Sequence, residues 1–137
     1  MLQPKRRKHR KDFRGRRRGL AYRGSTLAFG EYGIKSLGVC WMSAAQIEAA
    51  RRTVTGAMKR KGRVWLRVFP DKPVTSRAAG QRMGSGKGDI DRYVAVVKPG
   101  RIILEIAGIP QEVAYDALKK SMAKLPFKSK IIYKEQI

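Results

Sequence analysis

A block of basic residues at the amino end, residues 1–24, constrains this chain more than any other feature of its sequence. Eleven basic side chains stand there against a single acid, Asp12, and apolar residues are sparse. Such a segment cannot fold by burying apolar surface. We therefore expect an arm over 1–24, followed by one folded domain over 25–137, which is an ordinary length for a single domain.

The arm is either a solvated tail or a segment that orders on RNA or DNA, and its one-sided charge favours the second. The whole chain has a formal net charge of +22, and a compact domain so charged gains from an anionic partner. A membrane is a poorer partner, because no apolar run approaches the roughly 20 residues of a spanning helix. The predicted phosphate-binding residues of the arm are Lys5, Arg6, Arg7, Lys8, Arg10, Lys11, Arg14, Arg16, Arg17, Arg18 and Arg23.

Two helices are expected in the domain. Ser43 and Gln46 form a capping box that begins the first helix, and Gly62 is placed to end it. Pro110 begins the second helix, which Pro126 ends. The apolar stripe of the first helix comprises Ile47, Ala50, Val54, Ala57 and Met58.

Strand patterns fill most of the remaining domain, and Pro99-Gly100 is expected to join two of the strands as a hairpin. The sequence shows no repeating alternation of strand and helix. The predicted class is therefore α+β, a compact mixed sandwich with two helices packed on antiparallel strands. The expected strands cover residues 26–29, 34–41, 63–69, 92–98, 101–107 and 127–133.

Two surfaces of the domain are open to two interpretations. Arg52 can pair with Glu48 on the first helix, and Arg52 and Lys59 share one flank, which is either plainly solvated or a row of phosphate contacts. Within 63–69 one face interleaves cations with Trp65 and Phe69. That face suits nucleic-acid stacking, but aromatics of this size more often cover a second layer of the fold.

The segment from about 74 to 91 has no convincing periodicity, and loops of this length are usually functional or disordered. It contains GQRMGSGKGD, which superficially suggests a nucleotide-binding loop. Five residues rather than four separate Gly80 from Gly86, Gly88 stands where a Ser or Thr is needed, and no helix follows. A nucleotide-hydrolysing P-loop is therefore excluded.

Catalytic and metal-binding sites are not expected either. The sequence has one histidine, His9, and one cysteine, Cys40, which are far apart. Asp89 and Asp91 are a weak metal signal, because Lys87 and Arg92 flank them. We predict no catalytic residues, no metal and no cofactor.

Several ordered blocks resemble the bacterial-type large-subunit ribosomal protein L sixteen family over essentially the whole chain. They are MLQPKR at 1–6, RGLA at 18–21, FGEYGIKSL at 29–37, QIEAARR at 46–52, RVWLRVFPDKPVT at 63–75, RMGSGKG at 82–88, PGRIILEIAG at 99–108 and AKLPFKSK at 123–130. The resemblance implies a non-catalytic protein that binds large-subunit ribosomal RNA and helps to shape the aminoacyl-tRNA site near the peptidyl-transferase centre. The implied partners are that RNA, tRNA acceptor ends and neighbouring ribosomal proteins, with no membrane and no homo-oligomer.

Carried onto this sequence, the resemblance places the basic arm along ribosomal RNA, and Arg52 and Lys59, as a row of phosphate contacts, are predicted to bind the same RNA. The loop that would approach the tRNA acceptor end comprises Arg82, Met83, Gly84, Gly86, Lys87 and Gly88. The implied location is the ribosome, in a bacterial cytoplasm or the equivalent compartment of an organelle. The chain departs from many relatives at 76–79 and at Ser85, both less basic here, which leaves the detailed contacts of the loop open. A general nucleic-acid-binding module outside the ribosome remains the alternative.

Overall fold

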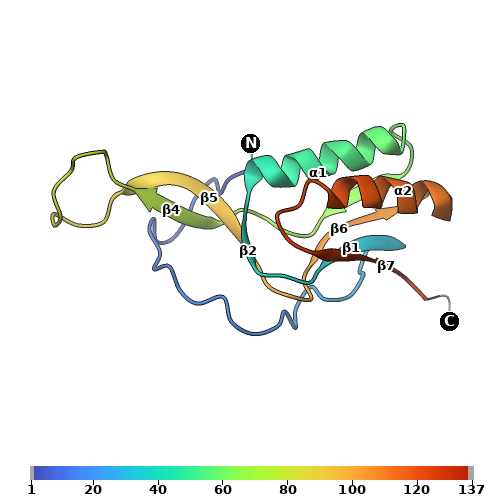
Figure 1. Ribbon diagram of the computed structural model, residues 1–137, viewed down its shortest axis with the longest axis horizontal. Helices are drawn as coiled ribbons and strands as arrows, with labels where there is room; N and C mark the ends of the chain where they lie inside the picture. Colours follow the sequence, from blue (N-terminus) through green and yellow to red (C-terminus); the bar gives the residue numbers. More distant parts are fainter. Residues whose placement is uncertain (1, 136–137) are drawn as a thin grey trace.

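The computed structural model describes residues 2–135, which form two antiparallel sheets and two helices (Figure 1). One sheet has four strands in the order β3-β6-β1-β7, and the other has three in the order β2-β5-β4. Both helices lie on the same side of the four-stranded sheet (Figure 1), which confirms the predicted α+β class. The elements are β1 Tyr32–Ser36, β2 Cys40–Ser43, α1 Ala44–Ala57, β3 Arg63–Leu66, β4 Lys72–Ser76, β5 Asp89–Val97, β6 Ile102–Ala107, α2 Gln111–Met122 and β7 Ser129–Tyr133.

The start of α1 follows from its sequence. The Ser43 side chain accepts a hydrogen bond from the Gln46 backbone N–H, and the Gln46 side chain accepts one from the Ser43 N–H. This is the predicted capping box, and it satisfies two donors that a helix end otherwise leaves unpaired. Ile47, Ala50 and Val54 are buried on the inner face of the helix, as their spacing predicted.

The expected end of α1 at Gly62 is wrong. The helix ends at Ala57, and Lys59 and Arg60 then adopt positive φ values of 53° and 60°. Gly62 instead allows the chain to pass close to β6, because a Cβ there would lie 2.5 Å from the backbone oxygen of Ala107. Lys59 therefore lies beyond the helix and does not share a helical flank with Arg52.

The predicted hairpin over 92–107 is also wrong. Pro99-Gly100 does form a turn, but β5 pairs with β2 and β4, whereas β6 pairs with β1 and β3. The chain thus passes from one sheet to the other at this turn. Strand pairing depends on partners that are distant in sequence, so two adjacent strand patterns do not by themselves specify a hairpin.

The strands expected over residues 26–29 and 34–41 differ from those in the structure. Residues 26–29 form no strand, and the single strand expected over 34–41 is divided into β1 and β2, which belong to different sheets. The Ser36 side chain makes the division: its hydroxyl donates to the Gly38 oxygen at 2.8 Å and accepts from the Gly38 N–H. The strand expected over 63–69 likewise ends at Leu66.

The gap expected from about 74 to 91 is shorter than predicted. β4 and β5 extend into it as a long hairpin that projects from the body of the molecule, leaving residues 77–88 as its tip (Figure 1). β4 begins at Lys72, before the expected gap starts. The predicted loop is therefore carried at the end of a two-stranded extension of the three-stranded sheet.

The carboxylate of Glu105, on β6, is completely buried. Glu105 accepts hydrogen bonds from the backbone N–H groups of Phe29 at 2.7 Å and Gly30 at 2.6 Å, and from Arg67 at 2.7 Å. Burial opposes its ionisation, but these donors and the N–H of Ala28 outweigh burial and lower the pKa of Glu105. Glu105 thereby fixes the irregular segment before β1 to the four-stranded sheet.

Candidate nucleic-acid interface

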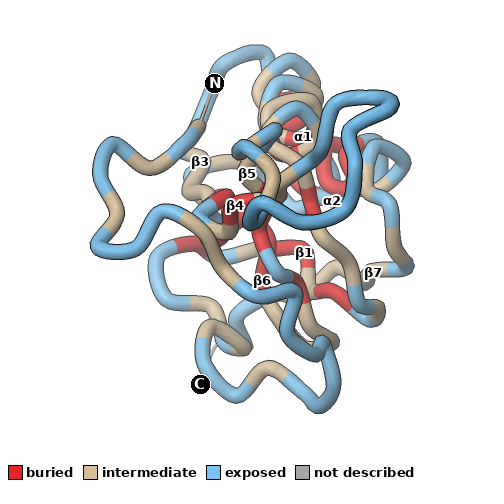
Figure 2. Tube along the Cα trace, turned by 90° about the vertical axis from the view of Figure 1, so that its left-hand side faces the viewer, coloured by how far each residue is buried: buried red, intermediate tan, exposed pale blue. Residues whose placement is uncertain are grey.

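The basic segment runs along the domain rather than away from it. Figure 2 shows this exposed stretch of chain beside the elements that it crosses. Leu2 packs against the hydrophobic core, the Ala21 N–H donates to the Pro99 oxygen at 2.8 Å, and Arg101 donates to the Arg23 oxygen at 3.0 Å. Residues 2–24 contain no helix or strand, so these contacts hold a segment that has no regular structure of its own.

Trp41 on β2 gives the middle of the arm a docking point. The guanidinium of Arg17 lies 5.0 Å from the centre of the Trp41 ring, and the Lys72 ammonium lies 5.5 Å from it. Lys72 also donates to the Phe13 oxygen at 2.7 Å. Cation–π contact of this kind is worth about 0.5–1 kcal/mol at exposed sites, enough to bias the course of the arm without fixing it rigidly.

The arm and the loop, predicted separately, meet in the structure. The Lys11 ammonium donates to the backbone oxygen of Lys87 at 3.1 Å. Residues 77–88 and the arm therefore contribute to one basic surface, which also includes Lys72. We call this set of residues, 8–18, Lys72 and 82–88, the arm–loop surface.

The loop is held closed by Arg77, which sequence analysis did not place in the site. Its guanidinium donates to the backbone oxygens of Gly86 at 2.7 Å and Arg82 at 3.4 Å. The remaining loop is open: Met83 is 94% exposed. In the part of the chain that the structure describes, no acceptor meets the backbone N–H groups of 82–87.

The three glycines of the loop serve two purposes. Gly84 and Gly86 have φ values of 101° and 92°, which side-chain-bearing residues rarely adopt, and open space surrounds both. Gly88 is different, because a Cβ there would lie 2.5 Å from the Ser76 oxygen. Gly84 and Gly86 thus shape an exposed tip that can approach a ligand closely, whereas Gly88 closes the hairpin.

Replacing Arg77 with Ala tests this view of the loop. We expect the backbone order parameters of residues 82–87 to fall, because both carbonyl contacts are lost, while the free energy of global unfolding stays within about 1 kcal/mol of the wild type, as is usual for exposed sites. NMR relaxation and denaturant titration measure the two quantities. Arg92→Ala, which removes an exposed ion pair on the neighbouring strand, is the matched control. Unchanged order parameters in the Arg77 variant would contradict the closing role.

Most basic side chains are free to meet an anionic partner. The described ion pairs engage Arg7, Arg51, Arg52, Arg67, Arg92 and Lys120, out of 32 basic residues in the sequence. Within the arm, Asp12 pairs with Arg7 at 2.9 Å. The other predicted arm residues have no carboxylate partner among the described residues, which leaves their charge available for phosphates.

Arg52 makes an ion pair within the helix α1. It donates through its Nε to Glu48 at 3.1 Å, confirming the predicted pair, and the adjacent Arg51 bonds to the same carboxylate. Hydrogen bonds from Arg51 and then Arg52 lower the pKa of Glu48 to about 2. The Arg52 side chain remains 76% exposed, so its terminal nitrogens can still reach a phosphate.

The two aromatics of the strand expected over 63–69 differ in burial. Trp65 is half-buried and stacks on Phe29, with ring centres 6.2 Å apart, so it covers part of the fold as expected of a large aromatic. Phe69, which the same expectation would bury, is 46% exposed. Arg67 lies 5.0 Å from the centre of the Phe29 ring.

Among residues 2–135 there is no cluster of three or more His, Cys, Asp or Glu side chains suited to a metal ion. Cys40 is half-buried, and burial raises the pKa of its thiol, although Arg17 partly opposes this. None of the helices described is long and apolar enough to cross a membrane.

A comparison with protein families is consistent with this basic surface. The family model described as ribosomal protein L16p/L10e matches residues 4–132. The match covers nearly the whole chain, including both halves of the arm–loop surface.

Proposed function

The chain belongs to the ribosomal protein L16p/L10e family, and on that premise we propose that its arm–loop surface contacts both ribosomal RNA and tRNA. Membership makes the protein a structural component of the large ribosomal subunit that binds its RNA. The proposal goes further: the arm lies along ribosomal RNA, while residues 82–88 reach the acceptor end of tRNA in the aminoacyl site near the peptidyl-transferase centre.

The observation that best supports a surface shared by arm and loop is the hydrogen bond from Lys11 to the Lys87 oxygen. It joins the arm to a projecting loop whose backbone N–H groups at 82–87 have no acceptor among the described residues. Backbone N–H groups left free beside Arg82 and Lys87 suit phosphate oxygens, because they combine directional donors with positive charge. The arm would neutralise phosphates over a longer path, and the domain would fix where the loop points. Catalysis is not part of the proposed role.

The loop proposal is tested by replacing both Arg82 and Lys87 with Gln. We expect tRNA binding at the aminoacyl site to weaken by roughly 10- to 50-fold at 0.1 M salt, because each lost phosphate contact removes a counterion-release contribution. Both substitutions keep the backbone oxygens that Arg77 and Lys11 bind. The measurement is filter binding of labelled aminoacyl-tRNA to purified ribosomes containing the variant.

The matched control carries Arg63→Gln and Lys134→Gln. It makes the same charge change on the four-stranded sheet and just beyond it, away from the sheet that carries the loop. We expect tRNA affinity to change by less than about threefold, since no contact to tRNA is proposed there. If both variants enter large subunits stoichiometrically and bind tRNA equally well, the loop does not contact tRNA.

A further inference from the structure

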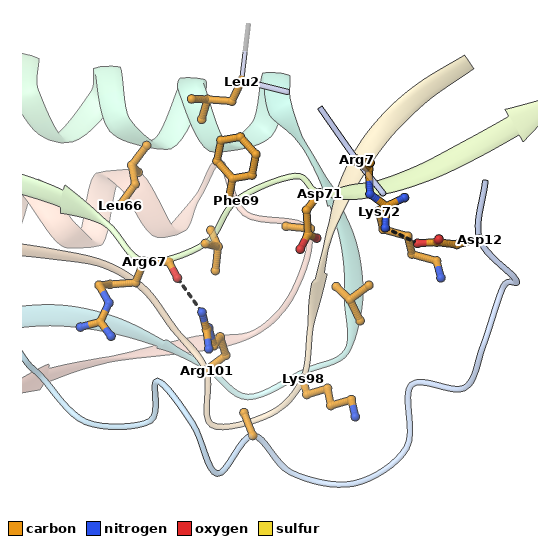
Figure 3. Close-up of a pocket in the computed structure, with 14 residues that line it drawn as sticks. Leu2, Arg7, Asp12, Leu66, Arg67, Phe69, Asp71, Lys72, Lys98 and Arg101 are labelled. Atoms are coloured by element: carbon orange, nitrogen blue, oxygen red, sulfur yellow. Dashed lines mark hydrogen bonds and ion pairs between the residues drawn. The ribbon is translucent and has the colours of Figure 1, made fainter. Parts of the chain in front are cut away.

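A cavity of about 720 Å³ lies between the arm and the two segments where the chain crosses between sheets (Figure 3). One crossing runs from β3 to β4 through residues 67–71, and the other from β5 to β6 through 98–101. Leu2, Arg7, Asp12 and Ala21 from the arm complete its lining. The volume is in the range of sites that hold a molecule of nucleotide size.

The two ends of this cavity differ in chemistry. Leu2, Leu66 and Phe69 lie together toward α1, whereas Arg67, Arg101 and Lys98 lie on the opposite side (Figure 3). Phe69 is nearly half exposed although it is a large aromatic beside the core. An apolar aromatic wall facing a cationic end matches the base and the phosphate of a nucleotide.

The charge around the cavity is unbalanced. Five basic residues line it against two acids, Asp12 and Asp71, and one of the five, Arg67, is already paired with Glu105 of β6. Arg7 donates to Asp12 through one nitrogen, but its other terminal nitrogen, Nη1, is buried and has no hydrogen-bond partner in the described chain. Lys98 has no ion-pair partner among the described residues. A buried donor without a partner is costly unless a ligand meets it, so the cavity is better suited to an anion than to an apolar group.

We propose that this cavity binds a single unpaired nucleotide of large-subunit RNA, with its base against Phe69 and its phosphate near Lys98 and Arg101. This assignment rests on the proposed function, because it requires that the arm lie on ribosomal RNA. It does not depend on the loop or on tRNA. The excess of basic residues favours RNA over a segment of a neighbouring protein.

Photo-crosslinking tests the occupant directly. A benzophenone amino acid replaces Phe69 in the full chain, the protein is incorporated into large subunits, and the attached molecule is identified by primer extension and mass spectrometry. We expect attachment to one or two adjacent nucleotides that are unpaired in the RNA. Attachment to a neighbouring protein, or no attachment from a stoichiometrically incorporated variant, would overturn the proposal.

Substitutions separate stacking from simple packing. Phe69→Leu keeps an apolar side chain but removes the ring, and we expect roughly tenfold weaker binding to large-subunit particles stripped of this protein, with Phe69→Trp close to wild type. Tyr115→Leu, which removes an exposed ring on α2, is the control and should have no such effect. Equal affinities for Phe69→Leu and Phe69→Trp would contradict stacking.

Lys98→Gln tests the phosphate end. The slope of log affinity against log salt should fall by about 1, the value for one lost phosphate contact, whereas Lys124→Gln should leave the slope unchanged. Equal slopes for the two variants would contradict a phosphate at Lys98. Suppose that the Phe69 and Lys98 variants bind stripped particles like the wild type, while the double variant of Arg82 and Lys87 still binds tRNA more weakly. The cavity assignment is then wrong and the proposed loop function stands.

Discussion

Neutralising four exposed basic residues of the arm is expected to weaken binding to large-subunit RNA by roughly 10²- to 10³-fold at 0.1 M salt. The variant replaces Lys8, Arg10, Arg16 and Arg18 with Gln. All four are exposed, and their side chains make no hydrogen bond or ion pair within the described chain. Each lost phosphate contact reduces the salt slope by about 0.7–0.9, so the slope should fall by about 3 in total.

The control for the arm is a second set of four substitutions with the same change in net charge. Lys119, Lys124, Lys130 and Lys134 are exposed residues on α2, β7 and their flanks. Their replacement by Gln should alter the salt slope much less than replacement of the arm residues. Equal slopes for the two variants would mean that binding follows net charge alone, and the specific role of the arm would be lost.

Loss of the buried carboxylate should have the largest effect on stability. We expect Glu105→Ala to lower the free energy of unfolding by about 3–5 kcal/mol, the usual cost of removing one partner of a buried ion pair. Arg67 loses its carboxylate, and the N–H groups of Ala28, Phe29 and Gly30 lose their acceptor. Denaturant titration monitored by tryptophan fluorescence measures the change.

The contribution of Glu105 should also depend on pH in a defined direction. Its pKa is lowered in the folded chain, so its stabilisation is complete above the ordinary carboxyl value of about 4.3 and is lost as the pH falls through the folded value. The difference in unfolding free energy between wild type and Glu105→Ala should therefore be complete above about pH 5 and should shrink as the pH falls below that value.

Asp116→Ala is the control for Glu105. Its pair with Lys120 is on the exposed face of α2, and such pairs are worth about 0–1 kcal/mol. If Glu105→Ala costs no more than Asp116→Ala, or if its cost is the same at pH 3 and pH 7, Glu105 does not anchor the segment before β1 as described.

The helices could be predicted because their signals are local. The capping box at Ser43 and the apolar stripe through Ile47, Ala50 and Val54 lie within a few turns of chain, and the structure confirms both. Pro110 likewise marks the start of α2, which begins at Gln111. Strand pairing needed information that no short window contains, which is why β5 and β6 were joined in one hairpin although they belong to separate sheets.

The site was predictable in its parts but not in its assembly. The arm and the RMGSGKG loop were visible from charge and glycine content, but the contact between Lys11 and Lys87 joins residues 76 positions apart. Arg77 lies within 76–79, where the sequence departs from many relatives, and in the structure it closes the loop. Glu105 had a signal that was missed: it is the single acid within an otherwise apolar strand, Ile102–Ala107.

Directed hydroxyl-radical probing from position 83 tests the central proposal most directly. Cys40 is the sole cysteine and is half-buried, so Cys40→Ser with Met83→Cys provides one exposed thiol for an iron chelate at the loop tip. Large subunits carrying this protein are probed with and without tRNA in the aminoacyl site. Our account predicts cleavage of the tRNA acceptor end together with nearby ribosomal RNA. Cleavage confined to peripheral ribosomal RNA, and unchanged when tRNA is added, would contradict it.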